Sequence, residues 1–312
     1  MVENKEKNFI SAVVYVHNQQ ETIQKFLGFL VKQLQTYFEK YEIICVNDAS
    51  ADNSVDEIRS FAQGITGGVI SILNMSFYQG VELAMNAGVD LSIGDFVYEF
   101  DNLCLDYQEN LVFDIYRHSL SGYDIVAAAP IHKQKFMSKL FYYIYNRVSD
   151  TQFKLQTETF RILSRRAINR VHSMSKTIPY RKAVYANCGL KMATLNYDNN
   201  KNSREKDISS HKKKKDIAVD TLILYSDAAY KFSIGITGAL MLVTLLIGIY
   251  TIYIYIVGKP VAGWTTTMLF LSLSFLGMFA VSTIMIKYLS LILKLIFTKQ
   301  KYVIESIEKL SN

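Results

Sequence analysis

Apolar and polar residues alternate in blocks along the N-terminal part of the chain, and the blocks predict strands and helices in turn. Compact β-branched runs have the length and composition of buried parallel strands. They span residues 9–16, 41–48, 68–74 and 94–101. The segments between them place apolar residues three and four positions apart, which predicts amphipathic helices over residues 21–37, 52–62 and 79–91. This alternation predicts an α/β fold with a doubly wound, mostly parallel sheet.

The pattern is less regular after Asp101, although it still indicates strands and helices. We expect helices over 109–120 and 135–150, a strand over 123–130, and a strand that passes into a helix over 160–171. Residues 1–195 therefore form the predicted soluble domain.

Two long apolar segments near the C-terminus change this picture. Residues 232–257 and 264–286 are each long enough to cross a hydrocarbon core, which needs about 20 residues. The short loop GKPVAG joins them, so residues 231–297 are predicted to form a transmembrane hairpin of two helices with both flanks on one side. The alternative is a helical hairpin buried in a soluble protein.

Charge indicates which side that is. The net charge of +6 arises from 34 basic and 28 acidic residues, and lysines gather before the first apolar segment and after the second. The positive-inside rule then places residues 1–195 and the tail, 298–312, in the cytoplasm. Because basic residues flank the apolar segments and are not interleaved with aromatic ones on a face, we expect a membrane and no nucleic acid as partner.

The segment before the hairpin, residues 196–230, is predicted to be a linker that ends in a helix. Residues 196–215 are polar and lysine-rich, whereas 216–230 has the spacing of an amphipathic helix. That helix either lies in the membrane interface or packs on the soluble domain. Association through the spans would give a homo-oligomer, and the three separated cysteines indicate a reducing compartment.

Acidic residues follow two of the predicted strands. Asp48 ends the strand 41–48, and Asp101 ends the strand 94–101. Ligands of doubly wound sheets bind beyond the carboxyl ends of the strands, so these acids mark a candidate site. Asp52 stands at a predicted helix start, where we favour a capping role for it.

Several motifs together resemble the family 2 glycosyltransferases, and within them the polyprenyl-phosphate sugar transferases related to dolichol-phosphate mannosyltransferase. The motifs are VYVHNQQETI, VNDASADNS, AGVDLSIGD before YEFDN, FRILSRRAINRV, and the C-terminal hairpin. The resemblance covers most of the chain and implies a GT-A-like fold. It also implies an inverting enzyme of cell-envelope glycan synthesis that moves a sugar from a nucleotide-sugar donor to a polyprenyl phosphate.

The resemblance also implies roles for individual residues. Asn18, Asp48 and Asp101 would bind the nucleotide-sugar, and Asp101 would be the catalytic and metal-binding acid for Mg²⁺ or Mn²⁺. The acceptor's phosphate would meet arginines, which grip phosphate in a planar fork. The candidates are Arg161, Arg165 and Arg181, and for each of them a solvated basic face is the alternative.

The chain departs from the family pattern at the metal motif. The second acid and the following glutamine are replaced by Leu103 and Leu105, and the acid before Phe160 is replaced by Thr159. Apolar side chains cannot ligate a hard cation, which requires oxygen. The departures predict weak or absent metal binding, an altered donor or lost catalysis. The alternative function is therefore a non-enzymatic partner or scaffold in a membrane glycosylation pathway.

Overall fold

The computed structural model describes residues 5–65, 67–131, 153–154, 156–174, 180–198, 228–258, 261–296 and 302–310. The chain divides into two units, one of residues 1–217 with 299–312 and one of residues 218–298. The predicted helix over 135–150 and most of the linker and helix over 196–230 lie outside the described residues.

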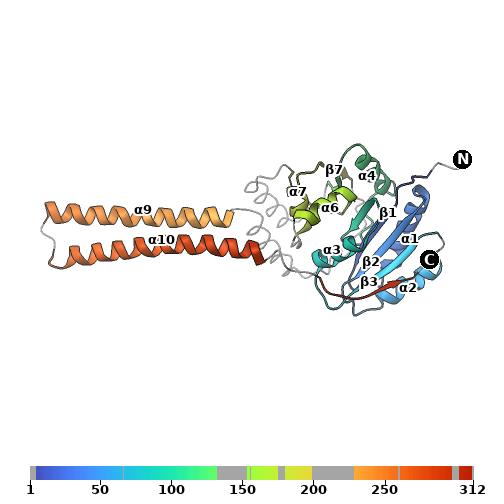
Figure 1. The fold of residues 1–312 in the computed structure, drawn as a ribbon, viewed down its shortest axis with the longest axis horizontal. Helices are drawn as coiled ribbons and strands as arrows, with labels where there is room; N and C mark the ends of the chain where they lie inside the picture. Colours follow the sequence, from blue (N-terminus) through green and yellow to red (C-terminus); the bar gives the residue numbers. More distant parts are fainter. Residues whose placement is uncertain are drawn as a thin grey trace. The chain divides into compact units, whose positions relative to one another are not determined.

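The first unit is built on one mixed sheet, which confirms the α/β fold class (Figure 1). Its order is β7-β5-β6-β4-β1-β2-β3-β8, and the block β3-β2-β1-β4 is parallel throughout. β6 runs antiparallel between β4 and β5, and β7 is parallel to β5. The strands are β1 (Ile10–Val16), β2 (Tyr41–Asn47), β3 (Val69–Met75), β4 (Phe96–Phe100), β5 (Ile125–Pro130), β6 (Phe160–Ser164), β7 (Met192–Tyr197) and β8 (Ile304–Lys309).

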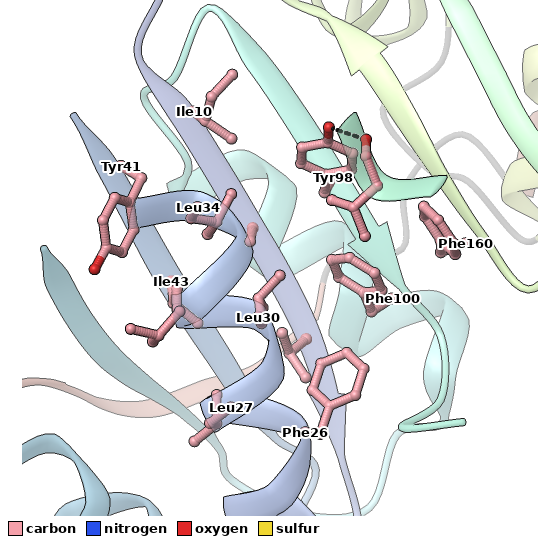
Figure 2. Packing of buried hydrophobic residues seen from close by; sticks show 14 of the residues in the cluster. Ile10, Phe26, Leu27, Leu30, Leu34, Tyr41, Ile43, Tyr98, Phe100 and Phe160 are labelled. Atoms are coloured by element: carbon pink, nitrogen blue, oxygen red, sulfur yellow. Dashed lines mark hydrogen bonds between the residues drawn. The ribbon is translucent and has the colours of Figure 1, made fainter. Parts of the chain in front are cut away.

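Helices cover both faces of this sheet, as its alternating side chains require. They are α1 (Ile23–Tyr37), α2 (Ser54–Gln63), α3 (Val81–Leu91), α4 (Leu111–Leu120), α6 (Arg165–Met174) and α7 (Arg181–Asn187). α1 lays its apolar stripe on one face, where Leu30 and Leu34 are fully buried with Ile43 of β2 and Tyr98 of β4 (Figure 2). All of these strands and helices were predicted from the sequence except α7, β7 and β8.

The opposite face of the sheet is closed by α3, which approaches it at a glycine. A Cβ atom on Gly88 would lie 2.3 Å from Val13 Cγ1 and 2.6 Å from Val46 Cγ2. Val13 and Val46 have side chains on the face away from α1, because side chains alternate along a strand. The same alternation along β4 places the side chain of Glu99 on the face covered by α3. Asp101, two residues further on and just beyond the end of the strand, lies on that side as well.

The C-terminal tail folds as a strand of this sheet, which sequence analysis did not predict. β8 pairs antiparallel with β3, from Ser71 opposite Lys309 to Met75 opposite Ile304. Arg59 of α2 donates from Nε and Nη2 to the carboxylate of Glu308, at 3.1 and 3.0 Å. The sheet therefore contains strands from before and after the apolar hairpin.

The second unit is a hairpin of two long helices, α9 (Ala228–Val257) and α10 (Trp264–Ile296), which run side by side (Figure 1). The 24 residues Ile234–Val257 of α9 and the 26 residues Trp264–Leu289 of α10 have mean hydropathies of 2.3 and 2.2. Of the most apolar stretch of each helix, 6% and 0% is buried. A helix of 24 residues is about 36 Å long, against about 30 Å of hydrocarbon. Both helices are therefore long and apolar enough to cross a membrane.

Candidate functional site

The parallel strands bring three predicted site residues to one edge of the sheet. Val16 at the end of β1 lies opposite Asn47, and Val14 lies opposite Phe100 at the end of β4. Asn18, Asp48 and Asp101 each follow one of these ends. The carboxyl edge of the sheet therefore carries all three, and Asp48 and Asp101 lie where the predicted strand ends placed them.

Asn18 links the turns after β1 and β2. Its backbone N–H donates to Ser50 Oγ at 3.1 Å, and its side-chain Oδ1 accepts from the backbone N–H of Ala51 at 2.8 Å. Asn18 and Ala49 have φ angles of 54° and 50°, the left-handed region that residues other than glycine adopt at a cost. Nearby, Asp52 accepts from the backbone N–H of Ser54, the first residue of α2, but the N-cap position of that helix is Asn53, so the predicted capping position was wrong by one residue.

The Asp48 side chain is fully buried and organises the loop after β3. Its Oδ1 accepts from the Gln79 N–H and its Oδ2 from the Gly80 N–H, both at 2.8 Å, and Oδ2 also accepts from the Tyr15 hydroxyl at 2.9 Å. Burial, and then the Asp48 charge, raise the pKa of Tyr15 far above its usual value, so the hydroxyl keeps its proton. In this conformation Asp48 holds the edge of the site through backbone groups.

The half-buried rings of His17 and Tyr78 meet at the same edge. Their centroids lie 4.5 Å apart with the planes tilted by 46°. His17 Nδ1 lies 2.7 Å from the Asp48 carbonyl oxygen, which can only accept, so Nδ1 carries the hydrogen in this contact. Sequence analysis did not include either ring among the site residues, since a single histidine beside a turn has no distinguishing pattern.

Two arginines hold Asp101 from both sides. Arg181 Nη2 donates to Asp101 Oδ1 at 2.6 Å, and Arg161 Nη2 donates to Oδ2 at 2.9 Å. The Asp101 side chain keeps 18% of its surface exposed, whereas those of Arg161 and Arg181 keep 1% and 0%. Burial alone would raise the pKa of the Asp101 carboxyl, but Arg181 and Arg161 hold that pKa well below its usual value. Asp101 is therefore ionised throughout the physiological range.

The same two arginines share a second carboxylate, Glu99. Arg161 lies directly opposite Glu99 in the β4–β6 pairing, and its Nη1 donates to Glu99 at 2.9 Å. Arg181 Nη1 and the Tyr185 hydroxyl donate to the other oxygen of Glu99 at 2.7 and 2.9 Å. The Nε atoms are also engaged, since those of Arg161 and Arg181 donate to Glu158 and Glu82 at 3.1 and 3.0 Å. Each guanidinium thus meets three different carboxylates.

The structure separates the three arginines that sequence analysis grouped as one phosphate site. Arg165 lies at the opposite edge of the sheet, where its Nε donates to the Gly94 carbonyl at 2.9 Å and its Nη2 to the Ser92 carbonyl at 3.0 Å, ahead of β4. This corrects the grouping, because β6 runs antiparallel to β4 and its end points away from Asp101. Arg161 and Arg181 do lie at the site but expose no guanidinium surface, so contact with a lipid phosphate stays a prediction.

The side chains around Asp101 do not fit a divalent cation. Leu103 is buried in the core and Leu105 packs against it, so neither position points a donor at Asp101. Asp106 is buried and accepts from the Tyr197 hydroxyl at 3.0 Å, and that hydroxyl lies 2.5 Å from Thr159 Oγ1. Within the part of the chain that the structure describes, no three His, Cys, Asp or Glu side chains form a metal-binding group.

The mixed sheet with helices on both faces has the GT-A fold, which is found in glycosyltransferases. A mannosyltransferase from Pyrobaculum calidifontis, solved with GDP-Man and Mn²⁺, has this fold, with a TM-score of 0.51, 12% identity, and coverage of 93% of this chain and 88% of that one. The Glycosyl transferase family 2 pattern matches residues 11–172, more than half of the chain. The chain belongs to glycosyl transferase family 2.

Curated relatives are similar over part of their length. An uncharacterized glycosyltransferase of Synechocystis sp. is 27% identical over 61% of this chain and 60% of its own. An undecaprenyl-phosphate 4-deoxy-4-formamido-L-arabinose transferase of Serratia proteamaculans is 30% identical over 40% and 38% of the two chains. A prophage bactoprenol glucosyl transferase homolog of Escherichia coli is 24% identical over 60% and 62%. The similarity thus spans less than two thirds of each relative.

Proposed function

We propose that the protein is a membrane-anchored, inverting transferase that moves a sugar from a nucleotide-sugar to a polyprenyl phosphate or a related lipid-linked acceptor. The observation that carries the proposal is the partly exposed, ionised Asp101 at the carboxyl edge of a family 2 sheet. Relatives named for transfer to undecaprenyl phosphate and bactoprenol support the lipid acceptor.

The donor would lie over the ends of β1, β2 and β4. Asn18 is exposed there, and the loop that Asp48 holds supplies the other wall. We propose that the nucleotide lies against the rings of His17 and Tyr78, and that the sugar lies nearer to Asp101. In this arrangement Asp48 acts on the nucleotide indirectly, by ordering the loop after β3. The direct contact between Asp48 and the nucleotide that the sequence predicts would require that loop to move.

The acceptor is a phosphate monoester, whose second pKa is about 6, so it is largely ionised at neutral pH. Its oxygen attacks the anomeric carbon while the bond from that carbon to the donor's phosphate oxygen breaks, and the nucleoside diphosphate leaves with the electron pair. An ionised nucleophile needs no strong general base, which makes Thr159 compatible with transfer. Arg161 and Arg181 would position Asp101 beside the sugar.

The hairpin supports a reaction at a membrane surface. A folded domain lies on one side of a membrane, and strands from before and after the hairpin share one sheet. Both ends of the hairpin would therefore meet the same side, and the flanking lysines favour the cytoplasm. An acceptor with a lipid chain and a charged headgroup would be within reach of such a domain, with cell-envelope glycan synthesis as the setting.

The test is transfer from a panel of UDP- and GDP-sugars to undecaprenyl phosphate by the full chain in detergent. We expect a lipid-linked product from one donor, and Asp101→Asn should lower its rate by about 100-fold or more, as the loss of a transition-state contact does. Asp114→Asn on the exposed face of α4 is the matched control and should leave the rate unchanged. The proposal is wrong if no donor yields product, or if both variants transfer equally well.

A non-catalytic partner in a membrane glycosylation pathway is the second candidate. It is favoured by the commitment of both Asp101 oxygens to arginines and by Leu103 and Leu105 in the metal motif. The donor panel distinguishes the two functions, because a partner protein would form no product with any donor.

A further inference from the structure

The geometry points to a nucleotide site that works without a divalent cation, in which the buried pair Arg161 and Arg181 takes the place beside Asp101 that a metal would need. This inference rests on the proposed function for the nucleotide, although its claim about the metal concerns the residues alone. It separates this chain from its Mn²⁺-containing structural neighbour.

Both oxygens of Asp101 are already bonded to arginines. A metal-bound carboxylate offers at least one oxygen lone pair toward open space, where water or phosphate completes the shell. Here each oxygen accepts from a different guanidinium, at 2.6 and 2.9 Å. The guanidinium groups are held in turn by Glu99, Glu82 and Glu158, so they cannot swing away without leaving buried charges unpaired.

The charges beside Asp101 also disfavour a divalent cation. A divalent cation at Asp101 would lie within a few ångströms of two permanent positive charges. Solvent screens this repulsion little, because both guanidinium groups are buried, and the carboxylates of Glu99, Glu158 and Glu82 that pair with them offset part of it. Arginine does not lose its proton in proteins, so the pair cannot relieve the repulsion by deprotonation.

The other described acids near the edge are engaged in hydrogen bonds within the protein. Glu99 is fully buried with both oxygens paired, and Asp106 is bound to Tyr197. The Asp48 carboxylate accepts three hydrogen bonds within the protein. Among the described acids that the two arginines hold, a cation that prefers six oxygen ligands would find mainly the exposed edge of Asp101.

The pair Arg161 and Arg181 keeps the Asp101 carboxylate ionised and fixes its orientation. Arg161 comes from β6 and Arg181 from α7, and each donates one N–H to Glu99 and one to Asp101. Glu99 in the sheet thus sets the orientation of Asp101 at the edge. Arg161 and Arg181 are positioning residues for Asp101, the most exposed of the four carboxylates that they hold.

The experiment measures metal binding and nucleotide binding separately on the full chain in detergent. Mn²⁺ is titrated into the protein without nucleotide while the paramagnetic resonance signal of the free ion is followed. UDP and GDP are then titrated calorimetrically, once with Mn²⁺ and once with a chelator. Both measurements are repeated on Asp101→Asn and on the control Asp114→Asn.

We expect no Mn²⁺ uptake that depends on Asp101, and a nucleotide affinity that changes by less than about twofold between Mn²⁺ and the chelator. If the wild type and Asp101→Asn bind the same amount of Mn²⁺, the ion binds away from Asp101, which agrees with the inference. Uptake lost only in Asp101→Asn overturns it, as does an affinity more than about tenfold higher with Mn²⁺. If neither nucleotide binds under any condition, the proposed function loses its support, while the Mn²⁺ titration still decides the inference.

Discussion

Replacing a glycine inside a helix of the sheet domain by alanine should change the stability of that domain. Whether stability rises or falls depends on how closely the helix packs at the glycine. In isolation, Gly→Ala within a helix stabilises by about 1 kcal/mol. For Gly28 of α1 that gain should be kept, because a new Cβ would meet only Phe61 Cε2, at an ordinary 3.8 Å. For Gly88 of α3, the new Cβ would lie 2.3 and 2.6 Å from Val13 and Val46.

The magnitude at Gly88 follows from those distances. Carbon atoms in contact are about 3.5–4.0 Å apart, so α3 and the sheet must separate by about 1 Å. Inserting atoms into a packed core costs about 1–3 kcal/mol, and the upper value applies because both neighbours are side chains of central strands. After the helix gain is subtracted, Gly88→Ala should lose about 2 kcal/mol, which lowers the melting temperature by about 4–8 °C in a domain of this size.

The assay is the reaction of a thiol-reactive dye with Cys45 on heating, in the full chain in detergent. Cys45 is fully buried in β2, and every cysteine of the chain precedes the hairpin, so the signal reports the sheet domain. The partly exposed Cys104 is replaced by serine in all variants. Gly28→Ala should raise the midpoint by about 2–4 °C. If Gly88→Ala also raises it, the close approach of α3 to the sheet is refuted.

Three further outcomes are expected. Ala49→Gly should stabilise by about 1 kcal/mol in chemical unfolding, because Ala49 has a φ of 50°, and an unchanged or lower stability would remove the argument for strain. The hydrogen bond from His172 to Asp90 raises the pKa of His172. The contribution of this ion pair to folding stability is therefore present below about pH 6.5 and is lost as the pH rises through the pKa of His172 in the folded protein. His172→Gln should therefore lower the melting temperature at about pH 6 and have little effect at about pH 8.5, whereas an equal effect at both would contradict the ion pair. Arg181→Met should cost about 3–5 kcal/mol of unfolding free energy, while Arg166→Met, whose side chain is 76% exposed, should change little; similar losses in both would argue against the buried cluster.

The parallel half of the fold was predictable because its signals are local. Runs such as 9–16 and 41–48 are mostly apolar, and each is followed by a helix with its own periodicity. β8 was missed because its apolar residues, Ile304 and Ile307, are three apart and do not alternate. Its inward-facing Ser306 and Glu308 bond to Asn74, so only the neighbouring strand makes this segment a strand.

The position of the candidate site could be predicted from the sequence, whereas the hydrogen bonds within it could not. Strand ends placed Asp48 and Asp101 at one edge, since this follows from parallel order alone. The partners of Asp101 depend on the register between β4 and β6, which sets Arg161 opposite Glu99, and on the fold of α7, which brings Arg181. Neither is encoded in the spacing of residues along the chain. The same antiparallel register sends Arg165 to the far edge.

The position of β8 behind the hairpin has a consequence for how the protein is made. A ribosome synthesises the chain from the N-terminus, so β1 to β7 emerge before α9 and α10, and β8 emerges last. Until then the outer edge of β3 has unpaired backbone groups, which can template pairing with other chains. The nascent domain is thus completed only after both apolar helices have left the ribosome. A chain stalled or cut within the hairpin would keep an open sheet edge, which quality-control proteases and chaperones could recognise.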